Sequence, residues 1–491
     1  MRASVAINKN ELHLAKEFVT EDNCYIYSPF LNNIYQLSLD AHKIFRELKY
    51  SYDSPMMQES DKTEEIIPKI EKELFLSTKP TKLRFKFQKS DIADKLNHSL
   101  EQLTLDMIED CNMRCRYCIN SGKFKFYRKY SNRRMDFDTA RKSIDYFVPR
   151  SGNNDHKPVI GFYGGEPLLN FPLVRRAIDY TREVYKEKSP DFMVTTNGTL
   201  ISKAIAEFFI NNEVRLCVSL DGPRMLNDRY RKFPDGRGSY DTIRRNMALI
   251  KDLNKDYYDH HVHYQPVLCP PYHYEQLIEF FMKDELFSQN TIFVISSVKS
   301  TDSSLRLNSY EKEAELDDRI YLQNLMKDYL LKNGYTGCDN FLKQFFVKEL
   351  SKIYSRRKGF CDHLKEYIHA PGICLPGKRR LLINSRGEFF PCERIEQSCP
   401  IGNVNDGFDL DKIGDFIEAY CSISERDCCK CWAFRLCGLC YIHAFRGGKL
   451  DLQFKRRNCR AERFRIANVL IAYMTVIEKN PGFFDTYRHF S

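Results

Sequence analysis

Three cysteine thiols lie close together in the first third of the chain, at Cys111, Cys115 and Cys118. Three clustered thiolates can bind three irons of a four-iron cluster and leave the fourth iron free to bind a small molecule. The same spacing also fits a structural zinc site, which requires a fourth ligand in the same segment or in a second paired-thiol loop, or a chance run in a cysteine-rich chain. Of these interpretations, the spacing favours the cluster with an open iron.

Three later loops carry side chains that suit a small polar ligand. The loop Gly164-Gly165-Glu166-Pro167 combines glycines, which let the backbone approach a ligand, with a carboxylate that can accept hydrogen bonds from a cationic amine. Asn197 and Ser219 lie in the other two loops, and Arg231 follows them. Amide, hydroxyl and guanidinium groups suit a ribose and a carboxylate. Each loop alone is equally typical of a turn or a helix cap, so the interpretation depends on their joint order.

A second group of thiols lies beyond residue 360. It consists of Cys374, Cys392, Cys428, Cys431, Cys437, Cys440 and Cys459. These thiols are too many for one tetrahedral zinc site and would nearly complete two four-iron clusters. A pair of zinc ribbons is the structural alternative.

Composition and length limit the classes of protein to which such sites can belong. The chain is long enough, at 491 residues, for two to four domains, and its 43% hydrophobic content can build their cores. The first residues lack the apolar core of a secretory signal, and the late apolar run 467–477 is too short to span a bilayer. These features predict a cytoplasmic protein with no membrane partner. Eighteen cysteines in such a chain favour metal binding over disulfides, because cytosolic thiols are kept reduced.

The formal net charge of +10 raises the question of a polyanionic partner. The basic residues are spread along the chain among 66 acidic ones, and only short runs such as 378–380 and 455–457 stand out. A basic face for nucleic acid is therefore less favoured than a solvated surface or an acidic peptide partner.

Strand-like and helical segments alternate from residue 98 onward. Helix-period segments such as 137–147 and 173–185 separate apolar runs that predict strands. These runs are 100–108, 158–163, 192–196, 216–220, 261–268 and 292–298. Repeated strand–helix units indicate parallel strands with right-handed crossovers, and six units predict an α/β fold, a partial (β/α)6 barrel related to the TIM barrel. Such folds carry their chemistry at the strand ends, and distinctive loops follow these strands.

Residues 1–90 predict a small separate module. Two β-prone runs, 25–28 and 33–37, flank a turn and predict a hairpin, and residues 41–49 and 63–76 have helical periodicity. A hairpin followed by helices is the layout of a winged-helix domain, with a simple dimerisation or packing element as the alternative. Residues 306–360 predict a helical connector with a helix over 311–333.

The cysteine motif and the three polar loops, in this order, resemble a radical S-adenosylmethionine (SAM) enzyme over residues 98–305. The resemblance implies a four-iron cluster held by Cys111, Cys115 and Cys118, whose open iron binds the amino and carboxylate groups of SAM. It implies SAM contacts at Tyr117, Gly164, Gly165, Glu166, Asn197, Ser219 and Arg231. One-electron reduction then cleaves SAM to a 5′-deoxyadenosyl radical, which abstracts a hydrogen atom, while the protein positions the substrate and excludes quenchers.

The thiols of residues 361–491 resemble the SPASM extension, which carries two auxiliary clusters and brings the total to three [4Fe-4S] clusters. The resemblance assigns Cys374, Cys392 and Cys440 to the first auxiliary cluster. It assigns to the second Cys428, Cys431, Cys437 and Cys459. The segment 437–440 is one residue shorter than the usual pattern, which puts the assignment of Cys440 in doubt.

The eighth auxiliary ligand is not fixed by this pattern. Cys361 is the first candidate, and an iron left open for substrate is another solution. The alternative thiols are Cys399, Cys421 and Cys429. The remaining cysteines are expected to be small buried side chains, and they are Cys24, Cys217, Cys269 and Cys338.

Glu393 follows Cys392 directly, at the place where sulfatase-maturing members carry an aspartate proposed as a general base. A carboxylate beside a cluster can take up the proton released when a substrate radical is oxidised. A solvated or salt-bridged glutamate is the alternative.

Enzymes with a SPASM extension mostly modify peptides and proteins, and the order of elements in residues 1–90 resembles the leader-recognition domain of ribosomal-peptide (RiPP) maturases. The resemblance therefore implies a precursor peptide bound through its leader, an electron donor such as flavodoxin or ferredoxin, and a cross-link such as a thioether as product. One alternative is a maturase of a sulfatase or of a quinone-cofactor subunit. A different class, an iron–sulfur or zinc nucleic-acid-binding protein, is the second alternative.

Overall fold

The computed structural model describes residues 14–29, 31–50, 82–85, 87–124, 127–152, 157–298, 324–325, 328–332, 340–358 and 367–484. The predicted helix 63–76, most of the predicted helix 311–333, and the thiols of Cys338 and Cys361 lie outside these residues.

The N-terminal part is a three-stranded antiparallel sheet followed by a helix. The strands β1 (Lys16–Val19), β2 (Cys24–Ser28) and β3 (Asn33–Leu37) lie in that order, and α2 (Leu39–Tyr50) follows. β2 and β3 form the predicted hairpin, in which Ser28 pairs with Asn33. β1 was not predicted, because its four residues Lys-Glu-Phe-Val are too few to show a clear alternation.

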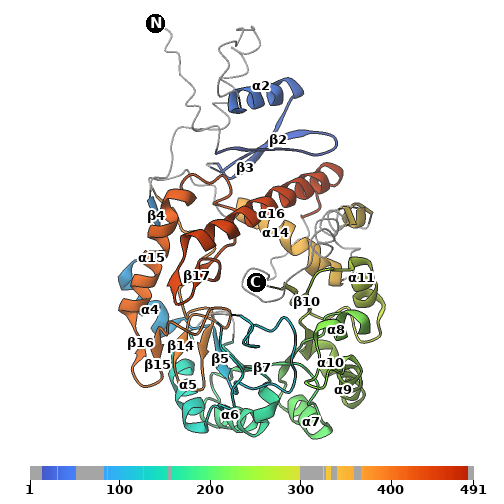
Figure 1. Ribbon diagram of the computed structural model, residues 1–491, viewed down its shortest axis with the longest axis vertical. Helices are drawn as coiled ribbons and strands as arrows, with labels where there is room; N and C mark the ends of the chain where they lie inside the picture. Colours follow the sequence, from blue (N-terminus) through green and yellow to red (C-terminus); the bar gives the residue numbers. More distant parts are fainter. Residues whose placement is uncertain are drawn as a thin grey trace.

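One carboxylate joins this sheet to the C-terminal helix α16 (Leu452–Lys479). Glu478 Oε1 accepts hydrogen bonds from Thr20 Oγ1 at 2.7 Å, Asn23 Nδ2 at 2.8 Å and Tyr25 Oη at 2.7 Å. Figure 1 shows the sheet lying against this end of α16, so the two ends of the described chain pack together.

The centre of the molecule is a seven-stranded sheet in the order β14-β13-β5-β6-β7-β8-β9. Five neighbouring strands are parallel, so the chain crosses back from the carboxyl end of each strand to the amino end of the next. They are β5 (Gln102–Asp106), β6 (Val159–Tyr163), β7 (Asp191–Thr196), β8 (Arg215–Val218) and β9 (Val262–Tyr264). Ile160, Val194 and Leu216 are fully buried in the core of this sheet.

Helices cover the outer side of this sheet (Figure 1). α5 (Phe137–Arg150) and α6 (Phe171–Val184) coincide closely with the predicted segments 137–147 and 173–185. The other helices around the sheet are α4 (Lys89–His98), α7 (Lys203–Asn211), α8 (Arg224–Tyr230), α9 (Tyr240–Leu253), α10 (Lys255–His261) and α11 (Tyr274–Lys283).

The sheet is open, and its last predicted strands are shorter than expected. The run 261–268 divides into β9 and β10 (Val267–Leu268) because Pro266, which lacks an N–H donor, interrupts the ladder. Within the run 292–298 only β11 (Ser296–Ser297) is a strand; it pairs in parallel with β10, while Phe293 forms an isolated bridge with Tyr264.

The other edge of the sheet comes from the cysteine-rich region. β13 (Leu381–Ile383) lies parallel to β5, and β14 (Phe389–Phe390) lies antiparallel to β13. A second link joins distant segments, because β4 (Lys82–Arg84) pairs in parallel with β12 (Tyr367–His369). The C-terminal region is therefore built onto the central sheet.

Two helices and two hairpins complete the C-terminal region. α15 (Leu410–Cys428) and α16 begin at the N-caps Asp409 and Asp451, whose side chains accept hydrogen bonds from Lys412 N and Phe454 N. The remaining described elements are η1 (Pro167–Asn170), α13 (Asn340–Leu342), η2 (Lys343–Val347), α14 (Lys348–Lys358), β15 (Gly402–Asn403), β16 (Gly407–Phe408), η3 (Tyr441–His443), β17 (Phe445–Arg446) and β18 (Lys449–Leu450). No helix in the described part of the chain is long and apolar enough to cross a bilayer.

Candidate functional site

The loop that carries Cys111, Cys115 and Cys118 follows β5 at the carboxyl end of the parallel strands. Backbone hydrogen bonds from Arg114 N to Lys232 O (2.8 Å) and from Arg116 N to Tyr230 O (3.0 Å) fasten it to the segment after α8. Cys115 is buried, and Cys111 and Cys118 are half-buried.

Burial changes the acidity of these thiols. It raises the pKa of the Cys111 thiol to about 12, with a further contribution from the Glu166 carboxylate, and it raises the pKa of Cys115 to about 11. Thiols of this kind are poor nucleophiles on their own and become thiolates when a metal supplies positive charge. This donor set therefore fits the ligands of an iron–sulfur cluster.

The two glycines of the 164–167 loop let it pack against the start of the cysteine loop. Gly165 N donates to Ile108 O at 2.7 Å, and Glu166 N donates to Asp110 O at 2.9 Å. A Cβ on Gly165 would lie 2.0 Å from Asp110 O, closer than any side chain can approach, and Gly164 has a φ of +148°. The close approach that the sequence predicted is therefore made to backbone, and it fixes Glu166 beside Cys111.

Glu166 is the centre of a buried hydrogen-bond network. Its carboxylate accepts hydrogen bonds from Thr196 Oγ1 at 2.7 Å, Asn197 N at 2.7 Å and Leu168 N at 3.2 Å. Burial raises the pKa of this carboxyl to about 7, against the lowering effect of these donors. Asn197 continues the network to the cysteine loop, since its Nδ2 donates to Asn112 Oδ1 at 2.8 Å and lies 3.8 Å from Cys111 Sγ.

A second buried network lies beside Cys115. Tyr117 donates from its hydroxyl to Asp221 Oδ2 and accepts from Arg231 Nη1 at 2.8 Å, and Arg231 Nη1 also lies 3.8 Å from Asp221 Oδ1. All three side chains are less than a tenth exposed. Arg231 Nε is buried without a hydrogen-bond partner among the described residues. The Arg231 guanidinium is therefore held through Nη1, and its Nε–H is available to a ligand.

The structure brings together every residue predicted to contact SAM. Tyr117 and Arg231 share one network, and Glu166 and Asn197 share the other. Ser219 lies beside the second network, because its backbone N donates to Thr196 O at 2.9 Å. Asp221 was not predicted as a site residue. Its position between Leu220 and Gly222, directly after β8, was the available signal.

Glu393 lies near the same end of the sheet, as a partner in ion pairs. It pairs with Arg380, and its Oε1 lies 3.8 Å from Arg394 Nε, while its Oε2 is buried without a hydrogen-bond partner in the described structure. Glu393 lines a small pocket with Tyr163 and Asp106. This geometry corresponds to the salt-bridged alternative, and a role for Glu393 as a general base stays a prediction.

Three C-terminal thiols, of Cys374, Cys392 and Cys440, lie close enough to influence one another, and Cys392 adjoins Glu393. Burial, the Glu393 carboxylate and the thiols of Cys440 and Cys374 raise the pKa of Cys392 to about 12. Burial and Cys440 likewise raise the pKa of Cys374. Despite its short spacing from Cys437, Cys440 thus lies with the two thiols to which the resemblance joined it.

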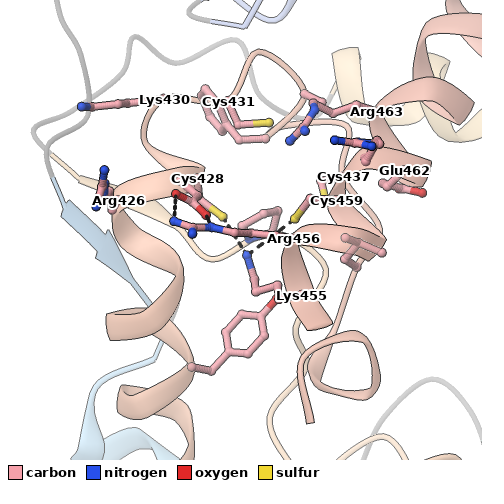
Figure 2. A pocket seen from close by; sticks show the side chains of 17 residues that line it. Arg426, Cys428, Lys430, Cys431, Cys437, Lys455, Arg456, Cys459, Glu462 and Arg463 are labelled. Atoms are coloured by element: carbon pink, nitrogen blue, oxygen red, sulfur yellow. Dashed lines mark hydrogen bonds and ion pairs between the residues drawn. The ribbon is translucent and has the colours of Figure 1, made fainter. Parts of the chain in front are cut away.

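The four thiols that the resemblance assigned to the second auxiliary cluster line an open cavity of about 520 Å³ between α15 and α16 (Figure 2). They are Cys428, Cys431, Cys437 and Cys459. Lys455 Nζ points into this cavity, 3.4 Å from Cys428 Sγ and 4.0 Å from Cys459 Sγ. A buried ammonium needs an anion beside it, and thiolates bound to metal would supply one, so this cavity also fits a cluster.

The candidates for the eighth ligand lie in different places. Cys421 and Cys429 are buried, 7% and 8% exposed, and Cys399 is half-buried near Lys412. The zinc alternative for these thiols makes a geometric requirement. Sulfurs bound to one zinc ion lie about 3.8 Å apart, given zinc–sulfur bonds of about 2.3 Å. Among the described residues, no group of three or more His, Cys, Asp or Glu side chains has the geometry to hold a single metal ion.

A sequence comparison identifies the domain that contains the cysteine loop. The sequence profile of the Radical SAM superfamily matches residues 105–282, which run from β5 to α11. Residues 105–282 therefore form a Radical SAM domain, which favours the radical SAM interpretation over the nucleic-acid-binding alternative.

Three known proteins are similar in sequence to parts of this chain. The chain is 26% identical over 356 residues to the radical SAM cyclopropyl synthase of Paramaledivibacter caminithermalis, covering 70% of this chain and 68% of that one. It is 29% identical over 144 residues to the serine-type anaerobic sulfatase-maturating enzyme of Bacteroides thetaiotaomicron, covering 29% and 34% of the two chains. It is also 34% identical over 155 residues to an uncharacterised protein of Methanocaldococcus jannaschii, covering 32% and 50% of the two chains. The last two matches thus span half or less of the relatives' own length.

A solved structure shares the fold. The structure of anSMEcpe with bound AdoMet superposes with a TM-score of 0.54 over 79% of this chain and 98% of that chain, at 18% sequence identity. The fold of this chain is thus that of a radical SAM enzyme with an open α/β sheet and additional C-terminal structure.

Proposed function

We propose that this protein matures a ribosomally made precursor peptide by removing a hydrogen atom from a core residue and forming a cross-link such as a thioether. One observation carries the proposal: the Cys111–Cys118 loop, the Glu166 network and the Arg231 network meet at the carboxyl ends of the parallel strands. Three [4Fe-4S] clusters, when bound, would supply electron transfer and the reductive cleavage of SAM.

The side chains around the cysteine loop divide the binding of SAM between them. Glu166, oriented by Thr196 and Asn197, accepts hydrogen bonds from the amine of SAM. Arg231, oriented by Tyr117 and Asp221, has its free Nε–H for the carboxylate. Ser219, at the end of β8, meets the ribose. Because the protein already holds both charged side chains before SAM binds, their immobilisation adds little entropy cost to binding.

The C-terminal thiols are assigned to two further clusters. Cys374, Cys392 and Cys440 would hold one, and the four thiols of the open cavity would hold the other. A cluster at Cys392 would lie next to the Glu393 carboxylate, and in this proposal that carboxylate takes up the proton released when the substrate radical is oxidised.

The peptide substrate is supported by the N-terminal sheet and by the relatives. β3 lies at the edge of the order β1-β2-β3, so its outer backbone groups can pair with an extended leader segment. The relatives include a sulfatase-maturating enzyme and a cyclopropyl synthase. Holding the leader at this sheet would raise the local concentration of the core peptide at the site.

A maturase of a protein, such as a sulfatase or a quinone-cofactor subunit, is the second candidate, favoured by the sulfatase-maturating relative. It needs no leader-binding sheet, so deletion of the sheet separates the two. The deletion should end at Tyr50, because β4 (Lys82–Arg84) pairs with β12 and its loss would damage the C-terminal region. A peptide maturase would lose turnover of the full precursor, whereas unchanged turnover would support the protein maturase.

Anaerobic reconstitution tests the chemistry itself. The wild-type chain should bind about twelve irons, four for each cluster, and should form 5′-deoxyadenosine from SAM with dithionite or a flavodoxin as reductant. Replacing Cys111, Cys115 and Cys118 together by alanine should abolish 5′-deoxyadenosine while leaving about eight irons. Retained SAM cleavage by this variant would refute the assignment.

A further inference from the structure

Lys455 is a buried lysine without a carboxylate partner in the part of the chain that the structure describes. It is 2% exposed, and it lies on α16 one helical turn before Cys459, so the two side chains share a face of the helix. Its Nζ lies between Cys428 Sγ, at 3.4 Å, and Cys459 Sγ, at 4.0 Å (Figure 2). The aromatic ring of Tyr420, on α15, lies 5.7 Å from the same nitrogen.

The carboxylates nearest along both helices are held by other groups, beginning with the N-cap Asp451, whose Oδ1 accepts a hydrogen bond from Phe454 N at 2.9 Å. Asp427 is bound by both nitrogens of a bidentate Arg456, at 2.7 and 3.1 Å. Glu462 is bound by Arg465 and by the backbone N–H of Gly438, each at 2.8 Å. Glu425 accepts a hydrogen bond from Leu83 N at 2.9 Å. The two sulfurs are thus the hydrogen-bond acceptors that the described structure gives to the Lys455 ammonium.

An ammonium in this position has a direct electrostatic effect on the cysteine cavity. Removing an ammonium from water is unfavourable unless an anion compensates it, and ligating thiolates are anions. Hydrogen bonds to sulfur and a positive charge nearby both favour the more negative, reduced state of an iron–sulfur cluster, and they therefore raise its reduction potential.

We propose that Lys455 is a positioning residue that raises the reduction potential of the cluster at Cys428, Cys431, Cys437 and Cys459, and so makes it an electron acceptor within the protein. The inference rests on the proposed function, which assigns a cluster to this cavity. It adds a named residue and a direction: the charge of Lys455 favours the cluster's uptake of the electron released when the substrate radical is oxidised.

Other cations around the cavity provide a matched control. Arg426, Lys430 and Arg460 also line it, but all three are exposed to solvent. Water and salt screen charges at such positions, so their effect on the potential is small compared with that of the buried Lys455. Lys430→Met therefore removes the same charge as Lys455→Met from the same cavity, but from its solvated rim.

The test measures the potential and not the activity. In the background of the Cys111, Cys115 and Cys118 alanine variant, two auxiliary signals remain for anaerobic redox titration followed by electron paramagnetic resonance. We expect Lys455→Met to shift one of the two reduction potentials to more negative values. Lys455→Arg, which keeps the positive charge, should retain most of the original potential. Lys430→Met should change neither potential. Unchanged potentials in Lys455→Met, or equal shifts in Lys455→Met and Lys430→Met, would overturn the inference.

Loss of the cluster in a variant also has a defined meaning. If Lys455→Met and Lys455→Gln each lose about four irons and Lys455→Arg keeps them, the positive charge is required to hold the cluster anion, which supports the inference. If Lys455→Arg loses them as well, Lys455 serves packing alone and the inference fails. The proposed function fails separately, in the wild-type chain, if that chain binds only about four irons.

Discussion

Replacement of Arg231 by methionine tests the buried charge network to which we assign the binding of the SAM carboxylate. Arg231 Nη1 lies 3.8 Å from Asp221 Oδ1, and both side chains are buried, 6% and 5% exposed. Opposite charges about 4 Å apart interact by about 4 kcal/mol at an effective dielectric constant of about 20. Arg231→Met leaves Asp221 as a buried carboxylate without its cation, so we expect it to lower the stability of the apoprotein by about 3–5 kcal/mol near pH 8.

The loss of stability in Arg231→Met should depend on pH in a defined direction. Burial already raises the pKa of Asp221 above its ordinary value, and Arg231 is the largest influence that lowers it. Without Arg231 the pKa rises further, so the folded state binds a proton more readily than the unfolded state and loses stability as the pH rises. The difference between the variant and the wild type should therefore shrink as the pH falls from 8 towards 5.

The assay is urea unfolding of the apoprotein, followed by circular dichroism at pH 8 and at pH 5. The double variant Arg231→Met with Asp221→Asn carries neither charge, and we expect it to be more stable at pH 8 than Arg231→Met alone. Both variants should lose SAM binding after reconstitution, because both lack the guanidinium. A double variant no more stable than the single one, with equal losses at both pH values, would refute the reasoning.

Two further perturbations test how neighbouring segments support the site. Gly165→Ala should lose SAM binding and about 1–3 kcal/mol or more of stability, because its Cβ would meet Asp110 O at 2.0 Å. Gly438→Ala is the matched control, since its Cβ would meet only Glu462 Oε1 at 3.4 Å; equal behaviour of the two in equilibrium dialysis with SAM would contradict the account. Glu478→Ala should release the N-terminal sheet and cost about 2 kcal/mol, because Tyr25 and two other side chains donate to one of its oxygens. Limited proteolysis should then cut before residue 40 faster than in the wild type; an unchanged rate would place the sheet's anchor elsewhere.

The sequence by itself predicted the chemistry that we propose, and it determined most of the central fold. The spacing of Cys111, Cys115 and Cys118 indicated the ligand set, because short-range spacing in one loop limits where three thiols can point. The strands β5 to β8 and the helices α5 and α6 were predicted close to their observed positions, because buried parallel strands are continuous apolar runs and helices repeat with a period of 3.6 residues.

Only the tertiary structure decided which residues from distant parts of the chain contact one another. Leu381–Ile383 is too short to be recognised as a strand, and it joins β5 through backbone pairing with residues far earlier in the chain. The connection of Asp221 to both Tyr117 and Arg231, and of Lys455 to the sulfurs of Cys428 and Cys459, likewise depends on loops and helices that local patterns do not orient. The sequence names the groups that can do the chemistry, whereas long-range packing sets the charge around each of them.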